Sequence, residues 1–157
     1  MKNMTLEHIT EVCGGTYFGP EEKKTAEAAD IVTDSRKAGA GSLFVAIPGE
    51  RVDGHKFIPN VAAQGALAVI SEQKLETPPC PYILVKDSME AIKAMAEYYM
   101  QQLNIPVVGI TGSVGKTSTK ETIASVLAQK YRVLKTDANF NNELGLSLTV
   151  FRLREED

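Results

Sequence analysis

The chain has 157 residues, of which 43% are hydrophobic and 24% are charged, the composition of an ordinary globular protein with one or two domains. Seventeen basic and twenty acidic residues give a net charge of −3 without any basic block, which argues against nucleic acid as a partner. No apolar run approaches the ~20 residues that a membrane span needs, so we expect no membrane insertion.

Residues that would mark an export signal, a disulfide framework or a metal site are few. The first eight residues carry charge where a signal peptide needs an apolar stretch. Cys13 and Cys80 have neither paired nor metal-binding spacing, and His8 and His55 form no metal-ligand pattern. We therefore expect a cytoplasmic protein.

The first 86 residues alternate strand-like and helix-like patterns, which predicts an α/β domain. Leu6, Ile9 and Cys13 share one face of a helix that ends at Gly14-Gly15, and residues 19–29 have the composition of a polar loop. A second helix is expected over 57–64, and short apolar runs predict strands at 31–33, 43–47, 66–70 and 82–85.

The longest helical pattern runs from Asp87 to Leu103, and Asp87 with Glu90 resembles a helix N-cap. We place a domain boundary after Lys86, giving domains at 1–86 and 87–157, with this helix covering the sheet of the second. Beyond it the patterns predict a strand at 105–110, a helix at 116–129, a strand at 131–135 and a helix near 144–151. Nucleotide-binding sheets generally have five or six strands, so we expect an incomplete P-loop α/β domain from the N-terminal part of a longer enzyme.

Residues 109–121, with the sequence GITGSVGKTSTKE, carry the most specific chemical signal in the chain. The pattern Gly112-x-x-Gly115-Lys116-Thr117 lies between a strand-like run and a helical pattern, the setting of a phosphate-binding loop. Its glycines let backbone N–H groups face a polyphosphate at a helix N-terminus. Lys116 adds positive charge, and the Thr117 hydroxyl can ligate Mg²⁺. We interpret the segment as a nucleoside triphosphate site. The strict phosphate-loop pattern requires a glycine six residues before the lysine, where this chain has Ile110. The alternative interpretation is a glycine-rich turn with a solvated lysine.

With these residues in view, the chain resembles the Mur ligases of bacterial cell-wall synthesis, and within them the branch that adds D-alanyl-D-alanine. The first matching segment, residues 33–58, looks like the family's uridine-nucleotide-binding domain. The second is the short phosphate loop at 111–117 followed by Lys120-Glu121, and the third is the asparagine-rich segment 139–145. Ser147 is a departure, because the family often has proline at that place.

The resemblance implies two ligand sites. Lys116 would be the catalytic residue that offsets charge on the transferred phosphoryl group, and Thr117 would be the metal ligand. The residues assigned to ATP are Gly112, Ser113, Val114, Gly115, Lys116, Thr117, Ser118, Asn139 and Asn142. The residues assigned to the UDP-linked substrate are Ser35, Arg36, Glu50, Arg51, Val52, Asp53 and His55. The structural alternatives are surface salt bridges for the arginines, a simple turn at Asp53-Gly54, a position at the start of a helix for His55 and helix capping by the asparagines.

The resemblance further implies an ATP-dependent ligase with Mg²⁺, whose partners are UDP-N-acetylmuramoyl-tripeptide and D-alanyl-D-alanine and which acts as a monomer. The family's later magnesium ligands and its C-terminal domain are not in this sequence, so we expect the 157 residues to bind without turnover. The alternatives are the Mur ligase that adds the third peptide residue, a folylpolyglutamate synthetase-like ligase and a stand-alone UDP-substrate-binding module. A P-loop kinase or GTPase is a weaker alternative, because no second acidic magnesium site follows.

Overall fold

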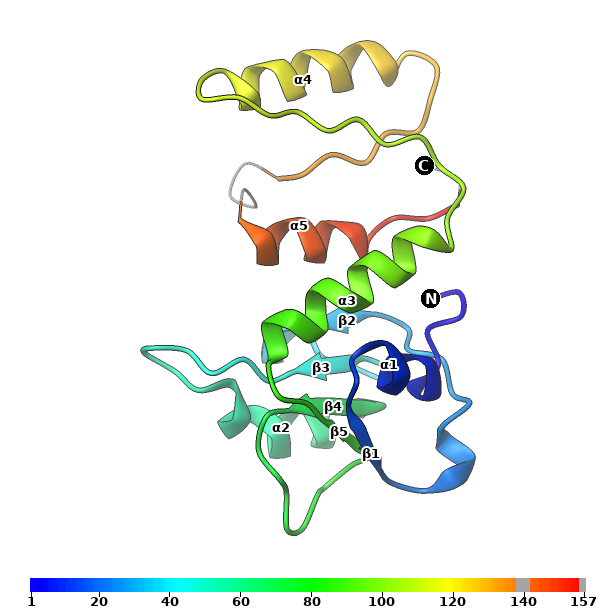
Figure 1. Cartoon of the computed structure of the whole chain (residues 1–157), viewed down its shortest axis with the longest axis vertical. Helices are drawn as coiled ribbons and strands as arrows, with labels where there is room; N and C mark the ends of the chain where they lie inside the picture. The colour runs from blue at the N-terminus through cyan, green and yellow to red at the C-terminus, as the bar shows by residue number, and fades with distance from the viewer. Residues whose placement is uncertain (138–141, 156–157) are drawn as a thin grey trace.

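The computed structural model describes residues 1–137 and 142–155, and its centre is one mixed five-stranded sheet (Figure 1). The strands lie in the order β1-β5-β4-β3-β2, with β2 to β5 parallel and β1 antiparallel to β5. Their bounds are Thr16–Phe18 (β1), Ile31–Val32 (β2), Leu43–Val45 (β3), Ala68–Ser71 (β4) and Tyr82–Leu84 (β5). The predicted α/β class is confirmed.

Helices cover both faces of the sheet, and the parallel strands β2 to β5 are accordingly apolar except for Ser71 at the end of β4. Alternate residues of β3 point to opposite faces, so that Leu43 and Val45 join one buried cluster and Phe44 joins the other. The first cluster includes residues of α1 (Leu6–Val12) and α3 (Ser88–Gln101), and the second includes residues of α2 (Ile58–Ala63). Short 3₁₀ turns lie at Glu21–Lys23, Ser35–Lys37 and Gly54–Phe57.

Helix α3 begins as predicted, because the Asp87 carboxylate accepts a hydrogen bond from the Glu90 N–H at 2.9 Å. Its buried face packs on the five-stranded sheet and on α1, so the expectation that it covers a second sheet is wrong for the described residues. The other side of this helix contacts α5 (Glu143–Val150), and the Tyr99 hydroxyl donates to the Leu153 carbonyl at 2.8 Å. The division into domains at Lys86 stays a prediction.

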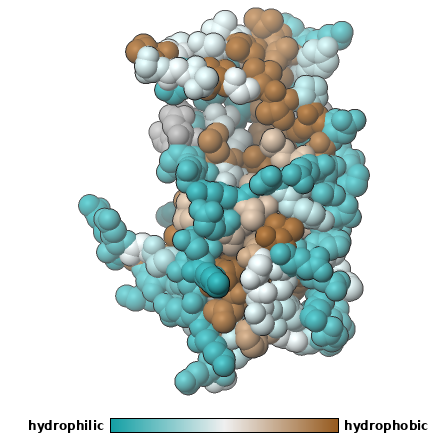
Figure 2. Space-filling view, in the orientation of Figure 1, coloured by the Kyte–Doolittle hydropathy of each residue, from teal (hydrophilic) through white to brown (hydrophobic). Residues whose placement is uncertain are grey.

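Helix α4 (Lys116–Leu127) lies apart from this body (Figure 1). Ala124 is its one buried residue, and the predicted strands at 105–110 and 131–135 are wrong for the described chain, which has no strand there. An apolar run becomes a strand only where a neighbouring strand is present to pair with it. Apolar surface therefore gathers around α4 in Figure 2. The large exposed apolar residues in α4 and in the segments on either side of it are Val107, Val108, Val114, Val126 and Tyr131.

The remaining predicted elements are confirmed with small shifts at their ends, and one strand was not predicted. Strand β1 begins two residues after Gly14, whose φ of +59° helps to end α1, and Tyr17 pairs with Ile83. The predicted strands β3 and β5 lie within apolar runs of four or more residues, whereas β1 begins with the polar, exposed Thr16 and is followed by Gly19-Pro20, so the sequence shows no such run there. Among the described residues, no helix combines the length and apolar character needed to cross a bilayer.

Candidate functional site

The residues assigned to the UDP-linked substrate come together at one edge of the sheet. Ser35 and Arg36 follow the carboxyl end of β2, and the loop of residues 48–54, which projects from the sheet in Figure 1, follows the carboxyl end of β3. Because β2 and β3 are parallel neighbours, both segments leave the sheet on the same side. The carboxyl edge of parallel strands is where open α/β sheets bind their ligands.

Arg36 is held by its own turn. The Asp34 carboxylate accepts the Arg36 backbone N–H at 3.0 Å, Nε at 2.9 Å and Nη2 at 2.7 Å. These hydrogen bonds from the Arg36 side chain lower the pKa of Asp34 to about 2. The Arg36 side chain is nevertheless 87% exposed, so its unpaired N–H groups face solvent. The surface salt bridge that was the structural alternative for Arg36 is present, and it pre-positions a guanidinium suited to phosphate oxygens.

Two glycines shape the loop of residues 48–54. A Cβ built on Gly49 would lie 2.6 Å from the Val52 carbonyl oxygen, and one on Gly54 would lie 2.8 Å from the Ile47 nitrogen. Both contacts are with backbone, so neither side chain could be accommodated without moving the loop. The tip of this loop is exposed and consists of Glu50, Arg51 and Val52.

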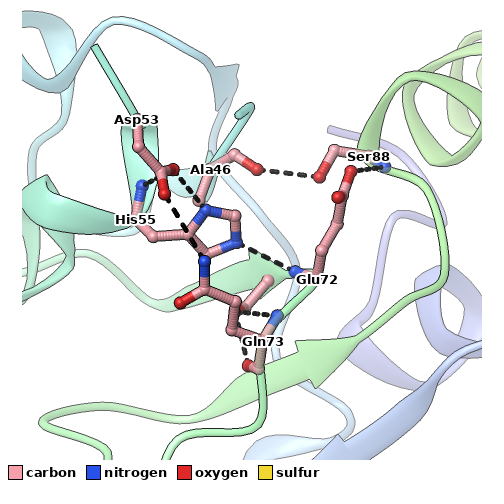
Figure 3. A network of polar contacts seen from close by, with 7 residues as sticks. Ala46, Asp53, His55, Glu72, Gln73 and Ser88 are labelled. Atoms are coloured by element: carbon pink, nitrogen blue, oxygen red, sulfur yellow. Dashed lines mark hydrogen bonds and ion pairs between the residues drawn. The ribbon is translucent and has the colours of Figure 1, made fainter. Parts of the chain in front are cut away.

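His55 lies behind this loop and points into the protein (Figure 3). Its Nδ1 lies 2.6 Å from Asp53 Oδ1, and its Nε2 accepts the Glu72 N–H at 3.0 Å. The His55 side chain is 6% exposed, so the ring faces protein groups. The His55 hydrogen bonds also lower the pKa of Asp53, the backbone N–H having the larger effect.

The phosphate loop has the backbone geometry that its glycines allow. Gly112 and Gly115 have φ of +150° and +79°, values that favour glycine, and Gly115 is the N-cap of α4. Because Gly115 has no side chain with which to cap the helix, it leaves the first N–H groups of α4 available to an anion. Lys116 Nζ donates to the Gly112 carbonyl at 2.5 Å, which folds the amine back over the loop.

The remaining loop residues are open to solvent. Ser113, Thr117 and Ser118 are exposed, and Val114 is 90% exposed. Such a loop suits a polyphosphate, because the uncapped N–H groups at the start of α4 and the amine of Lys116 lie close together in an exposed segment. Within the part of the chain that the structure describes, no group of three or more His, Cys, Asp or Glu residues could hold a metal ion. The Thr117 hydroxyl is the metal ligand that the sequence analysis assigned, and its role stays a prediction.

The asparagine-rich segment is only partly described. Asn139 lies outside the described residues. Asn142 is the N-cap of α5, where its Oδ1 accepts the Gly145 N–H at 2.8 Å, so the capping alternative is realised. Its contact with ATP stays a prediction.

Several contacts that position these segments were not predicted from the sequence. Lys120 Nζ donates to the Thr136 carbonyl at 2.5 Å, and Glu121 pairs with Lys135, so α4 holds the chain that leads to the asparagines. Lys93 of α3 pairs with Glu90 at 2.9 Å and with Glu143 at the start of α5 at 2.7 Å. Hydrogen bonding to Glu143, and then to Glu90, raises the pKa of Lys93. Only the Glu90–Lys93 spacing was visible in the sequence.

Two family descriptions match the chain. Residues 28–111 match "Mur ligase family, catalytic domain", and residues 110–157 match "Mur ligase middle domain". Together they cover both the sheet edge and the phosphate loop.

Relatives and solved structures agree with these matches. UDP-N-acetylmuramoyl-tripeptide–D-alanyl-D-alanine ligases of Bacillus subtilis and Escherichia coli are 40% and 38% identical over 99% of this chain. The chain spans about a third of their length, 34% and 33%. A crystal structure of MurF from Acinetobacter baumannii superposes with a TM-score of 0.86 at 33% identity, over 97% of this chain and 33% of that one. MurF ligase from Thermotoga maritima, solved in complex with ADP, has a TM-score of 0.70 at 37% identity, over 78% of this chain and 28% of that one.

Proposed function

The chain belongs to the Mur ligase family, and we propose that it is part of an ATP-dependent ligase that joins D-alanyl-D-alanine to UDP-N-acetylmuramoyl-tripeptide. The observation that carries this proposal is the presence in one chain of two separate sites. One is the substrate loop at the carboxyl edge of a parallel sheet, and the other is a glycine-rich loop at the N-terminus of α4. The relatives that carry this name are similar over nearly the whole chain.

The proposed reaction has two steps. A carboxylate oxygen of the tripeptide attacks the γ-phosphorus of ATP, so that an acyl phosphate forms and ADP leaves. The amine of D-alanyl-D-alanine then attacks the acyl carbon, phosphate leaves, a proton is lost and an amide bond remains. Such chemistry depends on positioning and charge stabilisation more than on a protein nucleophile.

In this proposal the phosphate loop serves the first step. The Lys116 amine donates to the Gly112 carbonyl. A bound polyphosphate would draw this amine onto its outer oxygens, because a hydrogen bond between two charged groups is stronger than one to a neutral carbonyl. The N–H groups of Gly115, Lys116 and Thr117 would contact the phosphates, and the Thr117 hydroxyl would ligate Mg²⁺. Ser113, Val114 and Ser118 would line the loop, and Asn139 and Asn142 would approach from the third segment.

The sheet edge would hold the uridine nucleotide. The exposed guanidinium of Arg36 and the hydroxyl of Ser35 suit a diphosphate or the uracil edge, and Glu50, Arg51 and Val52 form the tip of the loop that follows the neighbouring strand β3. We place the reaction in the cytoplasm, where ATP is available, and expect a monomer. The alternative acceptor, the third peptide residue, is disfavoured by the names of the relatives at 38–40% identity.

Isothermal titration calorimetry of the 157-residue chain tests the proposal. We expect UDP-N-acetylmuramoyl-tripeptide and a non-hydrolysable ATP analogue to bind independently, without phosphate release from ATP. Lys116→Ala should weaken the ATP analogue about ten- to a hundredfold, because a hydrogen bond to a charged group is worth about 1.5–3 kcal/mol. Lys130→Ala, three residues beyond the last residue of α4, is the matched control and should leave both affinities unchanged.

Two results would contradict the proposal: no binding of the UDP-linked tripeptide, and equal ATP-analogue affinity for the Lys116 and Lys130 variants. Phosphate release that Lys116→Ala abolishes would refute only the expectation of binding without turnover. In a longer protein that contains this chain, the amine acceptor identifies the branch, and use of a diamino acid in place of D-alanyl-D-alanine would overturn our choice.

A further inference from the structure

We infer that His55 does not contact the substrate and is instead the positioning residue that, with Asp53 and Glu72, fixes the loop of residues 48–54 for the uridine nucleotide. The inference rests on the proposed function, because it assigns a role within that site. It also separates His55 from the exposed loop-tip residues with which the sequence analysis grouped it.

The hydrogen bonds define the protonation state of the ring. The Glu72 backbone N–H can only donate, so His55 Nε2, 3.0 Å away, is the acceptor and carries no proton. The ring proton therefore resides on Nδ1, which donates to Asp53 Oδ1 at 2.6 Å. Asp53 Oδ1 also accepts the His55 backbone N–H at 3.0 Å, so the carboxylate holds both the backbone and the ring of His55.

The ring thereby joins two segments that are separate in sequence. One side is bonded to Asp53 at the base of the substrate loop, and the other to Glu72 directly after β4. The Asp53 carboxylate is also approached by Gln73 Nε2 at 3.4 Å, from the same segment after β4. The His55 side chain is only 6% exposed, so the imidazole connects Asp53 and Glu72 from a buried position.

Glu72 extends the connection to α3 (Figure 3). Its Oε1 accepts the Ser88 N–H at 2.7 Å, a favourable place for a carboxylate at a helix N-terminus. The Ser88 hydroxyl, buried, donates to the Ala46 carbonyl at 2.7 Å. The base of the substrate loop, the ends of β3 and β4 and the start of α3 are thus tied by successive hydrogen bonds.

A loop that binds a ligand needs such support, because a loose loop must be ordered when the ligand arrives. Removing the two ring hydrogen bonds should therefore weaken binding of the uridine nucleotide about tenfold. The ATP loop shares none of these contacts, so its affinity should not change.

The test compares His55→Phe with His8→Phe, the same change at the only other histidine of the chain. Calorimetry with UDP-N-acetylmuramoyl-tripeptide and with the ATP analogue gives two affinities for each folded variant. We expect His55→Phe to lose about tenfold toward the first ligand only, and His8→Phe to match the unmodified chain. His55→Gln, whose Oε1 can accept the Glu72 N–H, should recover part of the loss.

The ¹⁵N shifts of the His55 ring in the unmodified chain need no variant, and we expect the neutral tautomer with its proton on Nδ1. A proton on Nε2, or unchanged substrate affinity in folded His55→Phe, would overturn the inference while leaving the proposed function intact. An unmodified chain that fails to bind the UDP-linked tripeptide overturns the proposed function, and the inference with it.

Discussion

Replacing Gly54 with alanine tests whether the shape of the substrate loop depends on a missing side chain. Gly54 follows Asp53, and its N–H donates to the Ile47 carbonyl at 2.9 Å. A Cβ at this position would lie 2.8 Å from the Ile47 nitrogen, 2.9 Å from the Ile47 oxygen and 3.3 Å from the Ala46 Cα. Comfortable contacts of a carbon atom begin at about 3.5 Å, so the two backbone segments must separate by roughly half an ångström or more.

The size of the effect follows from the atoms that are too close. All three belong to backbone, which cannot rotate away as a flexible side chain could. Overpacking of this kind costs about 1–3 kcal/mol. Separation also stretches the Gly54–Ile47 hydrogen bond and moves Asp53 relative to His55, so affinity for the UDP-linked tripeptide should fall together with stability.

Urea unfolding followed by circular dichroism measures the free energy of unfolding, and the midpoint for Gly54→Ala should fall by about 1 M. Gly39→Ala is the matched control, because a Cβ there meets nothing within 4 Å. It should leave the free energy of unfolding unchanged or raise it by about 0.5 kcal/mol through the unfolded chain. Equal stability and equal substrate affinity of the two variants would refute the steric argument.

Two further predictions concern a titration and a buried hydroxyl. The pKa of Asp34 is lowered from 3.8 to about 2 by Arg36, so the pair stabilises the native chain above about pH 4 and this contribution is lost as the pH falls from about 4 to 2. A carboxyl ¹³C titration should show this pKa and its return toward 3.8 in Arg36→Gln; an unchanged pKa in that variant would contradict the assignment of its cause. Ser88→Ala leaves the Ala46 carbonyl without its donor and should cost about 1–3 kcal/mol in urea unfolding. Ser125→Ala, which loses an exposed hydroxyl on α4, should cost under about 0.5 kcal/mol, and equal losses in the two variants would count against the buried hydrogen bond.

Local patterns predicted the elements that bury their own apolar face. The spacing of Ile92, Ala96 and Tyr99 predicted α3. Asp87 followed by Glu90 predicted its N-cap, and the apolar run from Leu43 predicted β3. The strand predicted at 105–110 does not form, because its valines have the right propensity but the described part of the chain contains no strand with which they could pair.

The candidate site likewise contains residues that could be recognised in the sequence and one that could not. Gly112, Gly115 and Lys116 could be recognised because a phosphate loop is contiguous in sequence, and the structure gives both glycines the positive φ that the pattern requires. The role of His55 could not be recognised, because it depends on the backbone of Glu72, which only the parallel pairing of β3 with β4 brings near.

The sparse anchoring of α4 affects how its loop would meet a nucleotide. Helix α3 buries six residues, whereas α4 buries Ala124 alone. Segments with so few buried contacts open at a small fraction of the free energy that global unfolding requires. The helix would then unravel and re-form many times while the sheet stays intact, and only the formed state presents its N–H groups together. A nucleotide would therefore select that state, and its apparent affinity would be the intrinsic affinity scaled by the fraction of time that the helix is complete.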